Sequence, residues 1–101
     1  MNGRLFQFEW DEAKAHANER KHGVTFELAF SVFYDPRLLT VADLEHSETE
    51  ERWFSVGVAG NDALLSVVYV WSEADPAVIK VRLVSARNAT QAERRQYEER
   101  L

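Results

Sequence analysis

Residues 51–71 read ERWFSVGVAGNDALLSVVYVW, and this stretch decides the fold. Within residues 52–58 every second side chain is apolar, which is the period of a half-buried β-strand. Residues 64–71 form a β-branched and aromatic run, and Gly60-Asn61-Asp62 between the two segments is typical of a turn. The stretch therefore predicts two antiparallel strands joined by a short connection.

Two helices are predicted before this hairpin, after a short alternating strand at residues 5–9. Asp11 is placed to cap the first helix, because its carboxylate can accept from the N–H groups two or three residues on. Gly23 is placed to end it, since glycine adopts the left-handed backbone of that position without a Cβ clash. The second helix is expected from Thr25 to Asp35-Pro36, with one apolar stripe made by Phe26, Ala29, Phe30 and Phe33.

The remaining elements are strands and one last helix. Strands are predicted at residues 39–41 and 78–85, with a polar loop at residues 72–77 around Pro76. A capping box, Thr90-Gln91-Ala92-Glu93, opens the C-terminal helix. The order β-α-α-β-β-β-β-α predicts one α+β domain over residues 1–101, with helices packed on a twisted antiparallel sheet.

Composition excludes several classes of protein. The 101 residues contain no cysteine, which excludes a disulfide scaffold and a thiolate zinc site and fits a reducing compartment. No apolar run approaches the roughly 18–20 residues that span a bilayer, and residues 1–4 lack a signal-peptide core. We therefore expect a cytoplasmic protein with no membrane partner.

The charge is distributed unevenly along the chain. The net charge is −5 and the isoelectric point is about 5.1, which argues against a protein that coats nucleic acid through many phosphate contacts. Residues 35–76 hold 2 basic and 9 acidic side chains, whereas residues 77–101 hold 6 basic and 3 acidic ones. An enzyme that holds one phosphate needs only a few cations, and the basic end supplies them.

No compact catalytic motif is present in the sequence. It contains no phosphate-binding glycine loop, no nucleophile elbow and no zinc-binding helix. His16, His22 and His46 lack the spacing of metal ligands, and Glu12 with His16 is interpreted as a surface pair. Neither a metal nor another cofactor is expected.

The remaining polar residues fit a metal-independent ribonuclease. RNA supplies its own nucleophile, the 2′-hydroxyl, so the protein must move protons and stabilise charge on the phosphate. The candidates are spread along the chain: Lys21, His22, His46, Glu51, Arg52, Tyr69, Lys80, Arg82 and Arg87.

Arginines are the candidates for phosphate stabilisation, because guanidinium matches phosphate oxygens bidentately and stays charged. Arg82 alternates with Val81 and Leu83, so it should project from the sheet on the side opposite those residues. Arg52 and Arg87 are the other candidates. The alternative for Arg82 is an exposed cation on a solvated sheet.

Histidines and one glutamate are candidates for proton exchange. His22 ends the first predicted helix, where the helix dipole favours a cation suited to a general acid, although the same placement is common in purely structural histidines. His46 lies in an acidic segment and is either a solvated loop histidine or an RNA contact. Glu51 and Arg52 are either a base beside a phosphate clamp or an internal ion pair.

Three further residues are candidates for RNA binding. Lys21 and Lys80 supply cations, and Tyr69 can stack on an unpaired base. Tyr69 also lies on an apolar strand, so core packing is the alternative for its ring.

Six short segments, in order, resemble the BrnT family of bacterial toxins and together span nearly the whole chain. They are FEWDEAK (8–14), RKHGVTFE (20–27), FYDP (33–36), HSETEER (46–52), VSARNAT (84–90) and ERRQYE (93–98).

The resemblance implies a ribonuclease toxin of a type II toxin–antitoxin system, with a RelE-like fold. It also implies that a BrnA-type antitoxin with a ribbon-helix-helix domain inhibits the toxin, and that their complex binds operator DNA and represses its own operon. The residues that fall in or around the matching segments are His22, Arg52, Arg82 and Arg87. The alternative is a non-catalytic module that binds the antitoxin and acts only as a co-repressor.

Overall fold

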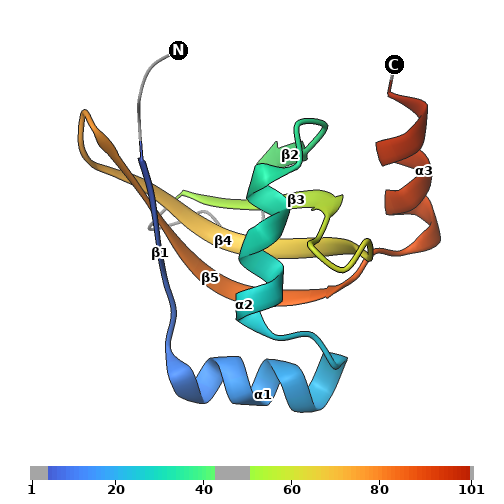
Figure 1. The fold of residues 1–101 in the computed structure, drawn as a ribbon, viewed down its shortest axis with the longest axis horizontal. Helices are drawn as coiled ribbons and strands as arrows, with labels where there is room; N and C mark the ends of the chain where they lie inside the picture. Colours follow the sequence, from blue (N-terminus) through green and yellow to red (C-terminus); the bar gives the residue numbers. More distant parts are fainter. Residues whose placement is uncertain (1–4, 43–50, 101) are drawn as a thin grey trace.

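The computed structural model describes residues 5–42 and 51–100 and confirms a single α+β arrangement (Figure 1). Its elements in chain order are β1 (Leu5–Glu9), α1 (Glu12–His22), α2 (Phe26–Ala29), the 3₁₀ helix η1 (Phe30–Tyr34), β2 (Leu39–Ala42), β3 (Arg52–Val58), β4 (Leu64–Asp75), β5 (Val78–Asn88) and α3 (Gln91–Glu99). The order of helices and strands is the predicted one.

The five strands form one sheet in the order β1-β5-β4-β3-β2. Strands β2 to β5 pair antiparallel, as predicted, but β1 pairs parallel to β5, so the prediction of a wholly antiparallel sheet is wrong at this edge. Short turns fix the direction of consecutive strands. No such turn links β1 to β5, because two helices, η1 and three strands lie between them in the chain.

The β4–β5 hairpin is longer than the sequence predicts. The prediction of a loop at residues 72–77 is wrong, since β4 runs to Asp75 and β5 begins at Val78. The Asp75 carboxylate closes the turn by accepting from the Ala77 N–H at 2.7 Å. Ser72, Glu73 and Asp75 are exposed in the strand, which explains why a polar sequence forms β-structure here.

The helices begin and end where the sequence places their caps. Asp11 Oδ1 accepts from Lys14 N at 3.0 Å, Gly23 ends α1 with φ +70°, and Thr90 and Glu93 form the predicted capping box. The second predicted helix starts after Thr25 as expected. It is α-helical only to Ala29 and continues as η1.

One face of the sheet, here called the α2 face, is covered by α2 and η1 (Figure 1). Phe26 and Phe33 from this helical segment belong to the main core, together with Tyr69, Val81 and Leu83 of the sheet. Burial of each large apolar side chain contributes about 1.5–3 kcal/mol, so this layer is the principal source of stability.

The opposite face, here called the α3 face, is covered by α3 only near one end. There Tyr97 forms a second, smaller core with Val56 and Leu64. Phe54 and Val68, further along β3 and β4 on the same face, are only partly buried. The α3 face is therefore the accessible side of the sheet.

Helix α1 closes the part of β5 that β1 leaves unpaired. β1 pairs with β5 only from Val78 to Arg82. Beyond that point the buried Asn18 side chain accepts from Ala86 N at 3.0 Å and donates to Ala86 O at 2.8 Å. This amide takes the place of a neighbouring strand and positions the C-terminal turn of α1 beside β5.

Candidate functional site

A row of charged side chains crosses the α3 face. Arg52 on β3 is opposite Val70 on β4, Val70 is opposite Arg82 on β5, and Arg82 is opposite Glu9 on β1. Paired residues of neighbouring strands point to the same side of a sheet, so both arginines and Glu9 share this face. All three charged residues are half-buried, whereas Val81 and Leu83 beside Arg82 are buried on the α2 face, as the alternation predicts.

Lys80 adds a third cation next to this row. It precedes Arg82 by two residues on β5, and its Nζ lies 4.0 Å from Glu9 Oε1. The side chains of Lys80 and Glu9 are 37% and 43% exposed, so water screens this ion pair, and such pairs contribute about 0–1 kcal/mol. An incoming phosphate can therefore replace Glu9 as the partner of Lys80 at a small cost in free energy.

Arg87 lies on the same face but is bound to α3. Its guanidinium donates to both carboxylate oxygens of Glu93, at 2.8 and 3.0 Å. These bonds raise the pKa of Arg87 and lower the pKa of Glu93, in each case against the effect of burial. Because Glu93 also belongs to the capping box, Arg87 ties β5 to the start of α3. A phosphate would have to share Arg87 with Glu93.

Lys21 and His22 lie at the border of the α3 face. Both line a shallow cleft between the last turn of α1 and β5, together with Val84 and Ser85. Ser85 is opposite Val68, which places it on the α3 face. Ser85 is three positions beyond Arg82, and a β-bulge between them lets both side chains face the same side; the two Cα atoms are at most about 10 Å apart along the strand.

The structure places Glu51 and Tyr69 away from this row. Glu51 precedes Arg52 by one residue and lines a pocket on the α2 face with Trp53 and Trp71. Tyr69 is 1% exposed, its hydroxyl lies 2.7 Å from Ser55 Oγ, and burial raises the pKa of its phenol. The Tyr69 ring is thus part of the core and is not accessible for stacking on a base. His46 lies outside the described residues.

Glu9 is the charged residue of this row that the sequence analysis missed. It is the last residue of β1, and its alternation with Phe8 indicates which residues share a side of the strand but not which strand lies next to it. Only the parallel register with β5 places the carboxylate beside Arg82 and Lys80.

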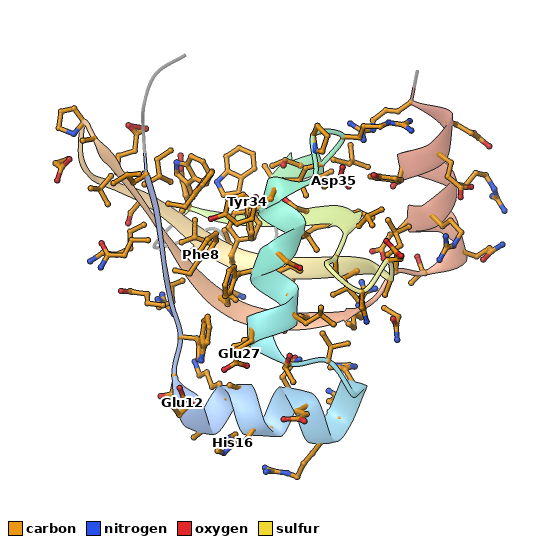
Figure 2. The ribbon with its side chains drawn as sticks, in the orientation of Figure 1. Phe8, Glu12, His16, Glu27, Tyr34 and Asp35 are labelled. Atoms are coloured by element: carbon orange, nitrogen blue, oxygen red, sulfur yellow. The ribbon has the colours of Figure 1, made fainter. Side chains whose placement is uncertain are left out.

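Other candidate sites are limited in the part of the chain that the structure describes. Glu12 and His16 are exposed on the outer side of α1 (Figure 2), in agreement with a surface pair. Within residues 5–42 and 51–100, no three histidine, aspartate or glutamate side chains gather so as to hold a metal ion. None of the helices described there is long and apolar enough to cross a membrane.

Comparison with known proteins identifies a family and a related solved structure. Residues 10–93 match the family described as "Ribonuclease toxin, BrnT, of type II toxin-antitoxin system". The fold is similar to the crystal structure of the Brucella abortus ribonuclease toxin BrnT, with a TM-score of 0.60, 22% sequence identity, and coverage of 86% of this chain and 100% of that chain. No curated protein matches the sequence.

Proposed function

The chain belongs to the BrnT family of ribonuclease toxins of type II toxin–antitoxin systems, and we propose that it cleaves RNA on its α3 face without a metal ion. The observation that carries the proposal is the row formed by Arg52, Arg82 and Glu9, with Lys80 beside it. This row combines cations for a phosphate with a carboxylate that can move a proton.

The two arginines are spaced to hold one phosphate from two sides. Arg52 and Arg82 are separated by one strand, and with about 4.8 Å between strands their Cα atoms are about 10 Å apart. Side chains as long as arginine span that gap from both sides, so both guanidiniums can contact the same phosphate. Such preorganised cations stabilise the negative charge that develops on the phosphoryl oxygens during displacement.

The reaction needs one base and one acid. The base takes the proton of the 2′-hydroxyl, the 2′-oxygen bonds to phosphorus, and the bond from phosphorus to the 5′-oxygen breaks. The acid then gives a proton to that 5′-oxygen, leaving a 2′,3′-cyclic phosphate and a 5′-hydroxyl. We assign the base to Glu9, which lies beside Arg82, and the acid to His22, at the border of the same face. Glu51 is a less favourable base because its side chain lines a pocket on the α2 face.

We also propose the partners of this activity. The antitoxin is a BrnA-type ribbon-helix-helix protein, the two proteins form a hetero-oligomer in the cytoplasm, and the complex binds operator DNA through the antitoxin to repress its own operon. Membership in a type II toxin family supports a protein antitoxin. The 2 basic and 9 acidic side chains of residues 35–76 favour a partner with a basic segment.

Cleavage of single-stranded RNA in the presence of EDTA tests this proposal. The purified chain, separated from any antitoxin, is expected to yield fragments with 5′-hydroxyl ends. Arg82→Ala is expected to reduce the rate about 10²-fold or more, because it removes a preorganised cation. Arg94→Ala is the matched control, since Arg94 is an exposed α3 residue that pairs with Glu98 at 3.8 Å.

Two results would contradict the assignment. Cleavage that stops in EDTA would indicate metal chemistry, and cleavage unaffected by Arg82→Ala would place the site elsewhere. A folded chain that cleaves no RNA but holds an antitoxin on operator DNA would instead support the co-repressor alternative.

A further inference from the structure

An apolar pocket opens on the α2 face, on the other side of the sheet from the cations. Its volume is about 310 Å³. The residues that line it come from β1, η1, the η1–β2 connection and the strands β2, β3 and β4, and they include Phe6, Phe33, Leu38, Trp53 and Trp71. A volume near the lower end of the range for ligand pockets is suited to one or two large apolar side chains.

Strand alternation separates this pocket from the proposed RNA site. Trp53 follows Arg52 on β3, and Trp71 follows Val70 on β4, so these two tryptophans point away from the arginine row. Thr40, which also lines the pocket, contacts Ser55 Oγ at 2.9 Å on the same side. A molecule bound in the pocket would leave Arg52 and Arg82 accessible.

The rim of the pocket exposes large apolar side chains. Phe6 and Tyr34 are 36% and 65% exposed. The rings of Phe6 and Tyr34 meet edge to face with centroids 6.4 Å apart, and Phe6 also contacts Trp71 at 6.1 Å. Figure 2 shows Tyr34 at the end of the α2–η1 segment, remote from Glu27 at its beginning. An apolar pocket with an exposed aromatic rim is typical of a protein-binding surface.

Charge and hydrogen bonding at the pocket indicate what kind of partner fits. The carboxylate of Glu51 is the charged group that lines it. The indole N–H of Trp53 is buried and has no acceptor in the described part of the chain. A peptide segment supplies a carbonyl for such a donor, and a basic side chain next to its apolar anchor complements Glu51.

We infer that this pocket anchors the antitoxin, receiving an apolar side chain from a segment that also carries lysine or arginine. The inference rests on the proposed antitoxin partnership. RNA is a poor occupant because Glu51 repels phosphate and the cations lie on the other face. A second copy of this chain is also a poor occupant, since a symmetric contact would bring two acidic rims together. The antitoxin thus holds the toxin at a place that RNA does not touch.

Binding of the purified BrnA-type antitoxin to the intact chain, measured by titration calorimetry, tests the inference. Tyr34→Ala is expected to raise Kd at least about tenfold, because it removes part of an exposed aromatic anchor, whereas Tyr34→Phe keeps the ring and the affinity. RNA cleavage by the free Tyr34→Ala chain is expected to equal that of the unmodified chain. Phe6→Ala, which alters the pocket wall itself, is expected to weaken binding in the same direction.

The charge of the rim is tested by a second pair of variants. Glu51→Lys is expected to raise Kd and to remove part of its salt dependence. Glu27→Lys makes the same change of charge on an exposed residue at the far end of the helical segment and is expected to leave Kd unchanged.

A Trp10→Phe background leaves only Trp53 and Trp71, so a change of tryptophan fluorescence on binding would report the pocket directly.

The outcomes separate this inference from the proposed function. An antitoxin that binds the Tyr34→Ala and Glu51→Lys chains as tightly as the unmodified chain would overturn the inference while leaving the toxin–antitoxin partnership intact. Loss of RNA cleavage by the folded Tyr34→Ala chain would place the rim in an RNA-binding surface, and this would also overturn the inference. If the Tyr34 variants change self-association instead, the occupant is a second copy. No binding to the unmodified chain would contradict the proposed partner itself.

Discussion

The hydroxyl of Tyr97 on α3 donates a 2.5 Å hydrogen bond to the carboxylate of Asp35, in the connection between η1 and β2. The same carboxylate accepts from the backbone N–H groups of Val58, on β3, and Arg37, each at 2.8 Å. Asp35 therefore joins the helical segment, the sheet and the C-terminal helix at one point. Together with the packing of Tyr97 and the Arg87–Glu93 ion pair, this bond holds α3 against its end of the sheet.

Removal of the Tyr97 hydroxyl is expected to destabilise the chain. Tyr97→Phe keeps the ring in the second core but removes a bond to a charged group, so the free energy of unfolding should fall by about 1–3 kcal/mol. Urea denaturation followed by circular dichroism measures this change. Tyr34→Phe removes an exposed hydroxyl and is the control, with an expected change below about 0.5 kcal/mol. Equal stability of the Tyr97→Phe and unmodified chains would show that the other contacts of α3 are sufficient to hold it.

The same carboxylate is expected to make stability sensitive to acid. Burial acts to raise the pKa of Asp35, but the hydrogen bonds from Tyr97, Val58 and Arg37 outweigh burial and hold the pKa below its usual value of 3.8. A carboxyl whose pKa is depressed in the folded state stabilises the fold above its unfolded pKa and loses that contribution as the pH falls through the folded pKa.

The measurement is the free energy of unfolding between pH 3 and pH 7, compared with that of Asp35→Asn. The advantage of the unmodified chain over Asp35→Asn should be constant above about pH 5 and shrink below about pH 4. An advantage that grows toward low pH would contradict the assigned direction.

Local sequence patterns predicted most of the fold because each depends on neighbours in the chain. The strand at residues 52–58 and the caps at Asp11, Gly23 and Thr90 lie where the sequence places them. The parallel pairing of β1 with β5 has no local signal, since it joins the two ends of the domain. The sequence predicts a loop at residues 72–77 because Ser72, Glu73 and Asp75 are exposed in the strand and show no alternation of apolar side chains.

The positions of the residues in the proposed site were predicted in part, for the same physical reason. Alternation within one strand placed Arg82 on the side opposite Val81 and Leu83, which needs no knowledge of neighbouring strands. The position of Glu9 depends on the β1–β5 register, which the sequence does not reveal. Glu51 is the chain neighbour of Arg52. Because neighbouring side chains of an extended chain point to opposite sides, Glu51 faces away from the arginine row.

The bond between Arg87 and Glu93 predicts a structural effect of Arg87. Arg87→Ala and Glu93→Gln should each lower the free energy of unfolding by about 1–2 kcal/mol, and a double-mutant cycle should show a coupling of about 0.5–3 kcal/mol. RNA cleavage by the folded Arg87→Ala chain should fall less than that of Arg82→Ala, because Glu93 already holds the guanidinium. A loss of cleavage as large as that of Arg82→Ala, without coupling to Glu93, would make Arg87 a direct phosphate ligand.

The buried amide of Asn18 is expected to be costly to replace. Asn18→Leu leaves the Ala86 N–H and C=O without the Asn18 amide at the edge of β5 that β1 does not cover, and each buried unsatisfied group costs about 1–3 kcal/mol. Hydrogen exchange at the Ala86 amide should be slow in the unmodified chain and faster in the variant. Glu19→Gln, at an exposed position on the same helix, serves as the control. Unchanged exchange at Ala86 would mean that another group protects this edge.

Glu9 gives the sharpest test of the proposed mechanism, because two roles of its carboxylate make different predictions. As the base, Glu9 must be ionised to accept the 2′-hydroxyl proton. Glu9→Gln should then lower kcat/KM about 10²–10⁴-fold and remove the fall in rate toward acidic pH that an ionising base produces.

As an ion-pair partner of Lys80 alone, Glu9 would matter mainly through RNA affinity. Glu9→Gln would then change KM and leave the shape of the pH–rate profile intact. Glu12→Gln, an exposed glutamate on α1, controls for the loss of one negative charge. Because Glu9 lies beside Arg82 in the row across the face, where a phosphate held by the arginines would present its sugar, we expect the first result.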